Sequence, residues 1–333
     1  MALQLENLEK IRRDFHKYPE LGFQEKRTKS KIANYLKELG LDVQCGSGII
    51  GVLRGGDGGK AIGLRADMDA LPIQETNTHS YISKNTGVMH ACGHDGHMAM
   101  LLGAAYRLSS NVNFKGTIVF IFQPNEELGL GAKAMIDEGL LKNFPIEEIY
   151  GIHNIPGVPT GELLTRTGII CSSESLFEIK IRGMGGHSSM PQLGRDAITI
   201  GAEVVQSLQT IISRRIAPGS GAVVSATEFI SNGQRNVLAS ETIIKGDVRT
   251  RRPDDRKKIE LYLNQIASGI ASAHDIEIEV FFETEFIETI NHIKPTEAVF
   301  KTAKKSGLKI TDCKPMSFSE DFAHFSNAVP GCF

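Results

Sequence analysis

The feature that most constrains the fold is a continuous apolar run, GTIVFIFQPNEE (residues 116–127), that ends in two adjacent carboxylates. An uninterrupted run of this kind predicts a strand buried on both faces, as in the centre of an α/β sheet. Shorter apolar runs at 48–55, 60–68 and 148–154 also predict strands, and helical patterns lie between them. Strands that alternate with helices indicate an α/β fold with helices on both faces of the sheet.

Three segments supply the helices expected around this sheet. Residues 5–39 predict two helices separated at Pro19, because apolar residues recur there at helical spacing. A further helix is expected from Met98 to Leu108, with Asp95 as its N-cap. The segment GAKAMIDEG (131–139) predicts a helix between the central strand and the strand at 148–154.

From about residue 171 the pattern changes to β-α-β-β-α-β. Strands are expected at 173–183, 222–230, 236–250 and 276–286, with one long helix before the second strand and another, starting at Pro253, before the last. This order is typical of a split, ferredoxin-like α+β sandwich. We therefore predict a second domain, 171–286, inserted into an α/β domain that is made of 1–170 and 287–333.

Length and charge narrow the class of protein. A chain of 333 residues is long enough for two domains. The net charge of -2, without a basic run, argues against partners such as nucleic acid or an anionic membrane surface. The five cysteines are widely spaced and form no CxxC pair, which favours reduced thiols in the cytoplasm. Neither a signal-peptide core nor an apolar stretch of roughly 18 residues is seen, so a cytoplasmic protein is expected.

The residues that carry chemistry gather in three clusters. Cys92 and His94 lie in HACGHDGH (90–97), just before a helix, where a thiolate and an imidazole can bind one ion. Glu126 and Glu127 follow the central strand, and His153 ends another. Ligands bind at the carboxyl ends of strands in such sheets, and buried carboxylates are costly without a cation nearby. The clusters predict a metal site, with zinc favoured by cysteine and histidine and manganese left open by the carboxylates.

Each cluster also has a structural interpretation when it is taken alone. A histidine at a strand end is commonly hydrogen-bonded structure, a Glu-Glu pair commonly faces solvent, and a buried cysteine is commonly a small hydrophobic residue. Three clusters at successive strand ends favour a metal site over these interpretations.

Seven motifs occur in a fixed order and resemble the N-acyl-amino-acid amidohydrolases, the family of hippurate hydrolases and plant auxin-conjugate hydrolases. The resemblance covers essentially the whole chain. The motifs are RRDFHKYPELGFQE (12–25), LRADMDALPIQE (64–75), MHACGHDGH (89–97), FQPNEELGLGAKAMIDEG (122–139), GIHN (151–154), GGHSSMP (185–191) and SEDFAHF (319–325).

The resemblance implies a metallopeptidase-type catalytic domain with a dinuclear metal site. Cys92 would bridge two divalent ions, with His94, Glu127 and His153 as further ligands. Zinc and manganese are the first candidates, and nickel or cobalt are also open. Glu126 would be the general base in the hydrolysis of small N-acyl amino acids, such as hippurate-like or N-acetyl substrates.

The resemblance also assigns the inserted domain the roles of lid and homodimer surface. His187 would stabilise the developing oxyanion and contact the substrate. Asn236 and Arg249 are candidates to hold the substrate, and Arg249 could pair with its free carboxylate.

Other polar residues near the motifs have two interpretations. Asp67 and Asp69 either orient a ligand histidine or cap a loop. We expect His90 and His97 to support the ligands or the structure, and His16 to be structural.

The chain departs from the family pattern at its end, VPGCF. The resemblance implies a further helix and a last ligand histidine, and His324 stands too early to replace that histidine. Phe318 occupies a position where the family usually has glycine. An alternative hypothesis is therefore a catalytically impaired form that binds metal or a carboxylated ligand; a structural zinc module is a third. Cys332 is expected to be exposed and oxidisable.

Overall fold

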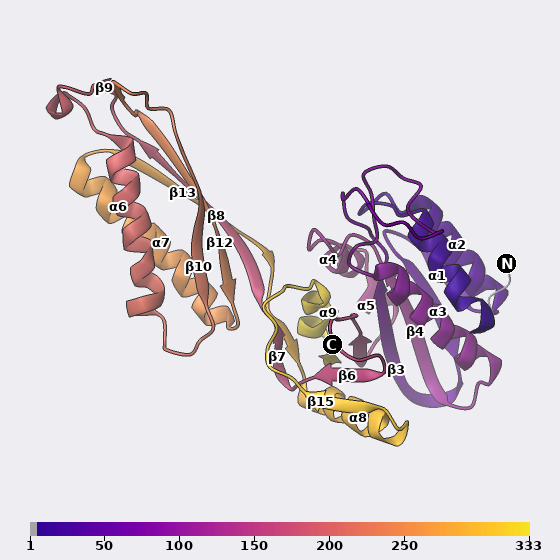
Figure 1. The fold of residues 1–333 in the computed structure, drawn as a ribbon. Helices are drawn as coiled ribbons and strands as arrows, with labels where there is room; N and C mark the ends of the chain where they lie inside the picture. The colour runs from indigo at the N-terminus through magenta and orange to yellow at the C-terminus, as the bar shows by residue number, and fades with distance from the viewer. Residues whose placement is uncertain (1–4) are drawn as a thin grey trace. The chain divides into compact units, whose positions relative to one another are not determined.

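A computed structural model describes residues 5–333 and divides the chain into two compact units (Figure 1). Unit 1 contains the described residues up to Ile170 together with Thr289–Lys314 and Glu320–Phe333. Unit 2 contains Cys171–Glu288 and Pro315–Ser319. The chain thus returns to unit 1 at Thr289 rather than at residue 287, and 315–319 belongs with unit 2.

Unit 1 is built on a mixed six-stranded sheet with the order β1-β2-β4-β3-β5-β16. β3 runs parallel to both β4 and β5, and β16 runs parallel to β5, whereas β1 and β2 are antiparallel neighbours. The predicted fold class of this part is confirmed. Its strands are β1 (Asp42–Cys45), β2 (Ile49–Arg54), β3 (Gly56–Asp67), β4 (Lys115–Gln123), β5 (Glu148–Gly151) and β16 (Gly331–Cys332).

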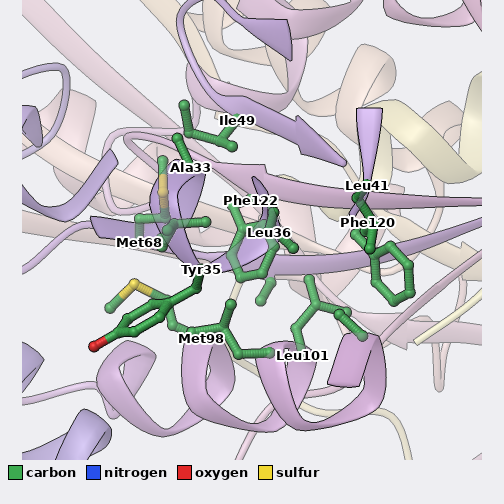
Figure 2. Packing of buried hydrophobic residues seen from close by; sticks show 14 of the residues in the cluster. Ala33, Tyr35, Leu36, Leu41, Ile49, Met68, Met98, Leu101, Phe120 and Phe122 are labelled. Atoms are coloured by element: carbon green, nitrogen blue, oxygen red, sulfur yellow. The ribbon is translucent and has the colours of Figure 1, made fainter. Parts of the chain in front are cut away.

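Helices cover both faces of this sheet because β4 is apolar on both. Phe120 and Phe122 point to one face, where Figure 2 shows them beside Leu36, Met98 and Leu101. Val119 and Ile121, one position along, pack into a separate cluster on the other face. The first face carries α1 (Leu8–Lys17), α2 (Lys26–Glu38) and α3 (His94–Ser110), and the second carries α4 (Gly131–Asp137), α5 (Leu140–Asn143) and α9 (Phe322–Ala328).

Helix α3 begins differently from the prediction. Gly93 is its N-cap, with φ of 94°, and a Cβ there would lie 2.2 Å from Asn154 Oδ1. Only glycine fits such a left-handed, crowded position. The prediction that Asp95 caps the helix is wrong: Asp95 lies in the first turn, is buried, and accepts hydrogen bonds from Arg12 and His16.

Shorter elements complete unit 1. β15 runs parallel to β6, and β14 pairs with β7, which leads into unit 2. The prediction that Cys332 is exposed is wrong, because β16 pairs with β5 and leaves Cys332 only 2% exposed. The elements are η1 (Leu5–Asn7), β6 (Glu162–Thr165), β7 (Gly168–Cys171), β14 (Thr289–Asn291), α8 (Ile293–Lys305) and β15 (Lys309–Asp312).

Unit 2 has the predicted ferredoxin-like order. Its four-stranded sheet, β10-β12-β8-β13, is antiparallel, and helices α6 and α7 pack on the apolar face. The strand expected at 236–250 is instead two strands, and the first of them pairs with β9 outside the main sheet. The elements are β8 (Ser173–Arg182), β9 (Gly186–His187), η2 (Pro191–Leu193), α6 (Ala197–Thr210), η3 (Ile211–Arg215), β10 (Val223–Ser231), β11 (Val237–Leu238), β12 (Glu241–Thr250), α7 (Pro253–His274) and β13 (Glu277–Phe286). Within residues 5–333, no helix combines the length and apolar character that a membrane span needs.

Candidate metal centre and active site

The parallel strands of unit 1 bring the three chemical clusters to one edge of the sheet. β3, β4 and β5 run in the same direction, so the residues that follow them meet at the carboxyl edge. Asp67 ends β3, Glu126 and Glu127 follow β4, and His153 follows β5. The first turn of α3 adds His94, which is fully buried.

The turn after β4 is fixed by two carboxylates from other segments. Asn125 has a left-handed backbone, with φ of 47°, and its N–H donates to the Glu25 carboxylate at 3.0 Å. The N–H of Glu127 donates to Asp69 at 3.0 Å. The backbone of the intervening Glu126 is therefore held between two anchored neighbours.

His94 is the centre of the cluster. Its Nδ1 lies 3.4 Å from Asp69 Oδ1 and 3.7 Å from Asp67 Oδ1. Its Nε2 lies 3.8 Å from Glu127 Oε1 and 4.0 Å from Glu126 Oε2. None of these contacts is a hydrogen bond, and among residues 5–333 neither ring nitrogen has a hydrogen-bond partner. The ring is thus surrounded by oxygen atoms that it does not bond.

Cys92 and His153 complete the cluster on the side of β5. Cys92 Sγ lies 3.3 Å from His153 Nε2, and the ligand atoms of Cys92, His94 and His153 are all within 4.8 Å of one another. The Nδ1 of His153 lies 2.7 Å from the Asn154 carbonyl, which orients the ring with Nε2 toward the thiol.

The charges of this cluster are poorly balanced without a cation. Burial raises the pKa of Glu126 well above its usual value, and Glu320 and Asp321 raise it further. Burial also raises the pKa of the Glu127 carboxyl and of the Cys92 thiol. Burial opposes protonation of His94, but Asp67 and Asp69 outweigh it and raise the pKa of His94 well above its usual value.

The donor set fits divalent metal ions. Two of the three groups that share His94 offer one thiol, two imidazoles and one or two carboxylates: Cys92–His94–His153 and His94–Glu126–Glu127; the third is Asp67–His94–His97. The buried atoms without a hydrogen-bond partner in the described chain include both nitrogens of His94 and Glu127 Oε1. Metal coordination accounts for such orphaned atoms, and sulfur with imidazole suits zinc and its neighbours in the transition series.

Sequence reasoning missed a buried arginine that anchors this edge. Arg65, on β3, is fully buried; it donates to Asp67 at 2.7 Å, to Glu320 at 2.7 Å and to Asp321 at 3.0 Å. Its Nε donates to Gln123 at the end of β4. The signal in the sequence was the arginine inside an otherwise apolar strand, since a buried charge needs a partner.

Neighbouring histidines make protein contacts instead of joining the donor groups around Cys92 and Glu127. His97 Nδ1 lies 2.6 Å from Asp67, and its Nε2 lies 2.6 Å from Asn154 Oδ1, so it ties the end of β3 to the segment after β5. His90 is buried, and burial lowers its pKa to about 4. His16 lies 2.9 Å from Asp95 and 3.2 Å from Glu75.

The candidates in unit 2 fall into two places. His187, on β9, and Asn236, in the turn before β11, are exposed neighbours, because the carbonyl of Asn236 accepts from the N–H of Ser188 at 3.0 Å. Arg249, on β12, is already paired with the carboxylates of Asp247 and Glu174.

Thiol, imidazole and carboxylate side chains that gather at the carboxyl edge of parallel strands are typical of metal-dependent hydrolases. Residues 63–333 match peptidase family M20/M25/M40, and the chain belongs to this family. It is a metal-dependent hydrolase of amide bonds.

Known relatives cover almost all of the chain. It is 40% identical to a hippurate hydrolase of Campylobacter jejuni over 95% of this chain and 84% of that protein. It is 34% identical to an N-acetylcysteine deacetylase of Bacillus subtilis over 97% of this chain and 86% of that protein. The crystal structure of a Bacillus subtilis protein, described as a dinuclear metal binding peptidase from the M20 family, superimposes with a TM-score of 0.86 at 32% identity, covering 98% of this chain and 87% of that one.

Proposed function

We propose that this protein hydrolyses the amide bond of N-acyl amino acids with two divalent ions bound at the edge of the unit 1 sheet. Cys92, His94, Glu127 and His153 would hold the ions. When bound, the ions would polarise the amide carbonyl and acidify water. The observation that carries the proposal is the buried ring of His94, whose unpaired nitrogens face thiol and carboxylate donors.

Glu126 is assigned as the general base. Its Oε2 lies 4.0 Å from His94 Nε2, and the anchored turn fixes its backbone. The raised pKa of Glu126, caused first by burial, gives the carboxylate a stronger affinity for a proton than an exposed glutamate has. Glu126 would accept a proton from the attacking water and deliver it to the leaving nitrogen, which becomes the free amino group of the product.

The residues of unit 2 would recognise the substrate. We assign His187 to the developing oxyanion and Asn236 to the substrate, a pairing supported by their adjacency on the β9–β11 ladder. Arg249 is proposed for the substrate carboxylate, for which it would have to exchange its contact with Glu174 or Asp247. The test is the KM for substrates with and without a free carboxylate.

Several finer features belong to the same proposal. The relatives that act on hippurate and on N-acetylcysteine support an N-acyl amino acid as the substrate. The donor set supports zinc or manganese, with nickel or cobalt as further options. Five free cysteines support a cytoplasmic location. A homodimer through unit 2 is supported by β10, an edge strand with exposed Phe229 and Ile230; light scattering in solution tests it.

The experiment compares Glu126→Gln with the wild type in the hydrolysis of benzoylglycine and N-acetyl amino acids. The variant keeps the shape of the side chain but cannot accept the proton, so kcat should fall by about 10²–10⁴ while the metal content per chain is unchanged. Glu147→Gln, an exposed glutamate of the same unit, is the matched control and should keep full activity. An undiminished rate in Glu126→Gln would remove Glu126 from the base role. If the wild type bound its full complement of metal but hydrolysed none of these substrates, the alternative of a catalytically impaired, metal-binding form would be favoured.

A further inference from the structure

A second histidine cluster lies on unit 1, and His16 connects it to Asp95 in the first turn of α3. His16 on α1, Glu75 and His79 place one imidazole nitrogen each and one carboxylate oxygen within 4.8 Å of one another. This group shares no residue with the groups around His94, Glu126 and Cys92. Nothing in the proposed hydrolysis uses it.

The distances within this cluster suit a small metal ion. Glu75 Oε1 lies 3.2 Å from His16 Nε2 and 3.1 Å from His79 Nε2. Ligand atoms around tetrahedral zinc, at about 2.0–2.2 Å from the ion, are separated by about 3.3 Å. The two separations from Glu75 Oε1 differ from this value by a few tenths of an ångström, so each histidine lies at the distance from Glu75 that a shared ion requires.

The cluster also has the outer contacts of a metal site. The Nδ1 of His16 lies 2.9 Å from Asp95 Oδ2, and that oxygen accepts from Arg12 at 3.1 Å. In the tautomer in which Nδ1–H donates to Asp95, the Nε2 lone pair of the ring is directed at Glu75, as in carboxylate–histidine–metal arrangements. His16 Nε2 and Glu75 Oε1, 3.2 Å apart, therefore need either a proton or a cation between them.

Glu75 is held by groups other than the histidines. Its Oε2 accepts from the N–H of Ser83 at 2.7 Å, and its Oε1 accepts from the side-chain amide of Asn77 at 3.0 Å. The Glu75 carboxylate therefore keeps its position when the two histidines lose their Nε2 protons and bind an ion instead.

Solvent reaches the cluster from the side of His79. The His79 side chain is 29% exposed, whereas those of His16 and Glu75 are 7% and 0% exposed. The His79 ring stacks on Tyr81 at 3.9 Å between centroids, which keeps its Nε2 directed at Glu75. The cluster is therefore within reach of solvent from the side of His79.

We propose that His16, Glu75 and His79 form a separate binding site for a borderline divalent transition-metal ion such as Zn²⁺. The site would link α1 to the segment from Glu75 to Ser83. Two imidazoles and one carboxylate with an open position are a recognised zinc donor set. The competing arrangement has protons on both Nε2 atoms and no ion.

The test is the number of zinc ions retained by the full-length chain. Wild type, His79→Leu and His274→Leu are loaded with Zn²⁺ at pH 7.5, desalted against a weak chelator, and measured by elemental mass spectrometry. His274 is the matched control because it also forms a histidine–glutamate pair, with Glu203 at 2.7 Å, but in unit 2 and without a second histidine ligand. His79→Leu should retain one ion fewer than the wild type, and His274→Leu should retain the same number.

Two outcomes would overturn the proposal. Equal zinc in the wild type and His79→Leu would mean that the cluster is held by protons alone. Equal losses in His79→Leu and His274→Leu would mean adsorption at surface histidines. A second variant, His79→Gln, tests whether any loss of zinc comes from misfolding. Circular dichroism and benzoylglycine hydrolysis are its folding controls. It should bind one zinc ion fewer than the wild type and keep the hydrolytic rate. Because the readout is a difference between variants, it is independent of how many ions the site around His94 binds.

Discussion

The buried carboxyl group of Glu25 offers a sharp test of the energetics around the candidate base. Its side chain is fully buried, and one carboxylate oxygen has no hydrogen-bond partner among residues 5–333. Burial raises the pKa of Glu25 from 4.5 to about 7, even though the N–H of Asn125 donates to the carboxylate. We predict that Glu25→Gln stabilises the protein at alkaline pH.

The sign follows from the protons that each state binds. Between pH 4.5 and about 7 the folded state holds a proton on Glu25 that the unfolded state has lost, so the stability from this group is fully present below 4.5 and is lost as the pH rises through 7. A difference of about 2.5 in pKa corresponds to about 3 kcal/mol. Glutamine cannot ionise but can still accept from Asn125, so the variant should gain up to about 3 kcal/mol at pH 8 and much less at pH 5.

Urea unfolding followed by tyrosine fluorescence measures this effect. The chain has no tryptophan, and five of its six tyrosines lie in unit 1, so the signal reports mainly on that unit. A strong chelator keeps metal binding out of the comparison. Glu9→Gln, an exposed glutamate on α1, is the control and should leave the pH dependence unchanged. An equal gain at pH 5 and pH 8, or none at pH 8, would refute the assignment of a raised pKa to Glu25.

Two further predictions concern buried side chains. Arg65→Met leaves the carboxylates of Asp67, Glu320 and Asp321 without their cation, and it should lower the free energy of unfolding by about 3–5 kcal/mol in the same urea assay; a loss below 1 kcal/mol would show that the pairs are dispensable. Cys45 is exposed and Cys332 is buried, and burial raises the pKa of the Cys332 thiol. We therefore expect Cys45 to account for a fast phase of labelling by a thiol reagent, and Cys45→Ser should remove that phase. Cys332→Ser should change the labelling kinetics only when the protein is unfolded in urea. Rapid labelling of Cys332 in the folded protein would contradict its burial.

Much of the fold was predictable because its signals are local. The apolar run at 116–127 indicated a central strand, and β4 is that strand, with phenylalanines on one face and aliphatic residues on the other. The order of elements in 171–286 likewise indicated the ferredoxin-like sheet. In both cases, side-chain periodicity within one segment decides which face is buried.

Features that depend on distant contacts were not predictable. Aspartate is a common N-cap residue, so Asp95 was expected to cap α3. Its carboxylate instead accepts hydrogen bonds from His16 and Arg12, some 80 positions earlier in the sequence. Cys332 is buried because β16 joins the sheet beside β5. The partners of Arg65 lie 255 and 256 positions away, so the sequence showed the isolated charge but not what neutralises it.

The candidate site was predictable as a set of donors but not as an arrangement. The residues Cys92, His94, Glu126, Glu127 and His153 were expected near strand ends, and the parallel strands bring them together in unit 1. The anchoring of the turn by Glu25 and Asp69 was not expected, because neither residue is a neighbour of that turn in the sequence. The roles of His187, Asn236 and Arg249 remain predictions.

The ion pairs between Arg65 and the segment 320–321 impose an order on biosynthesis. Arg65 leaves the ribosome 255 residues before Glu320, a delay of roughly 10–50 s at usual elongation rates. Until then β3 carries a charge that it cannot neutralise by these pairs, whereas nearly all of unit 2 has already been translated. The inserted unit can therefore complete its folding while the first unit waits for its last segment.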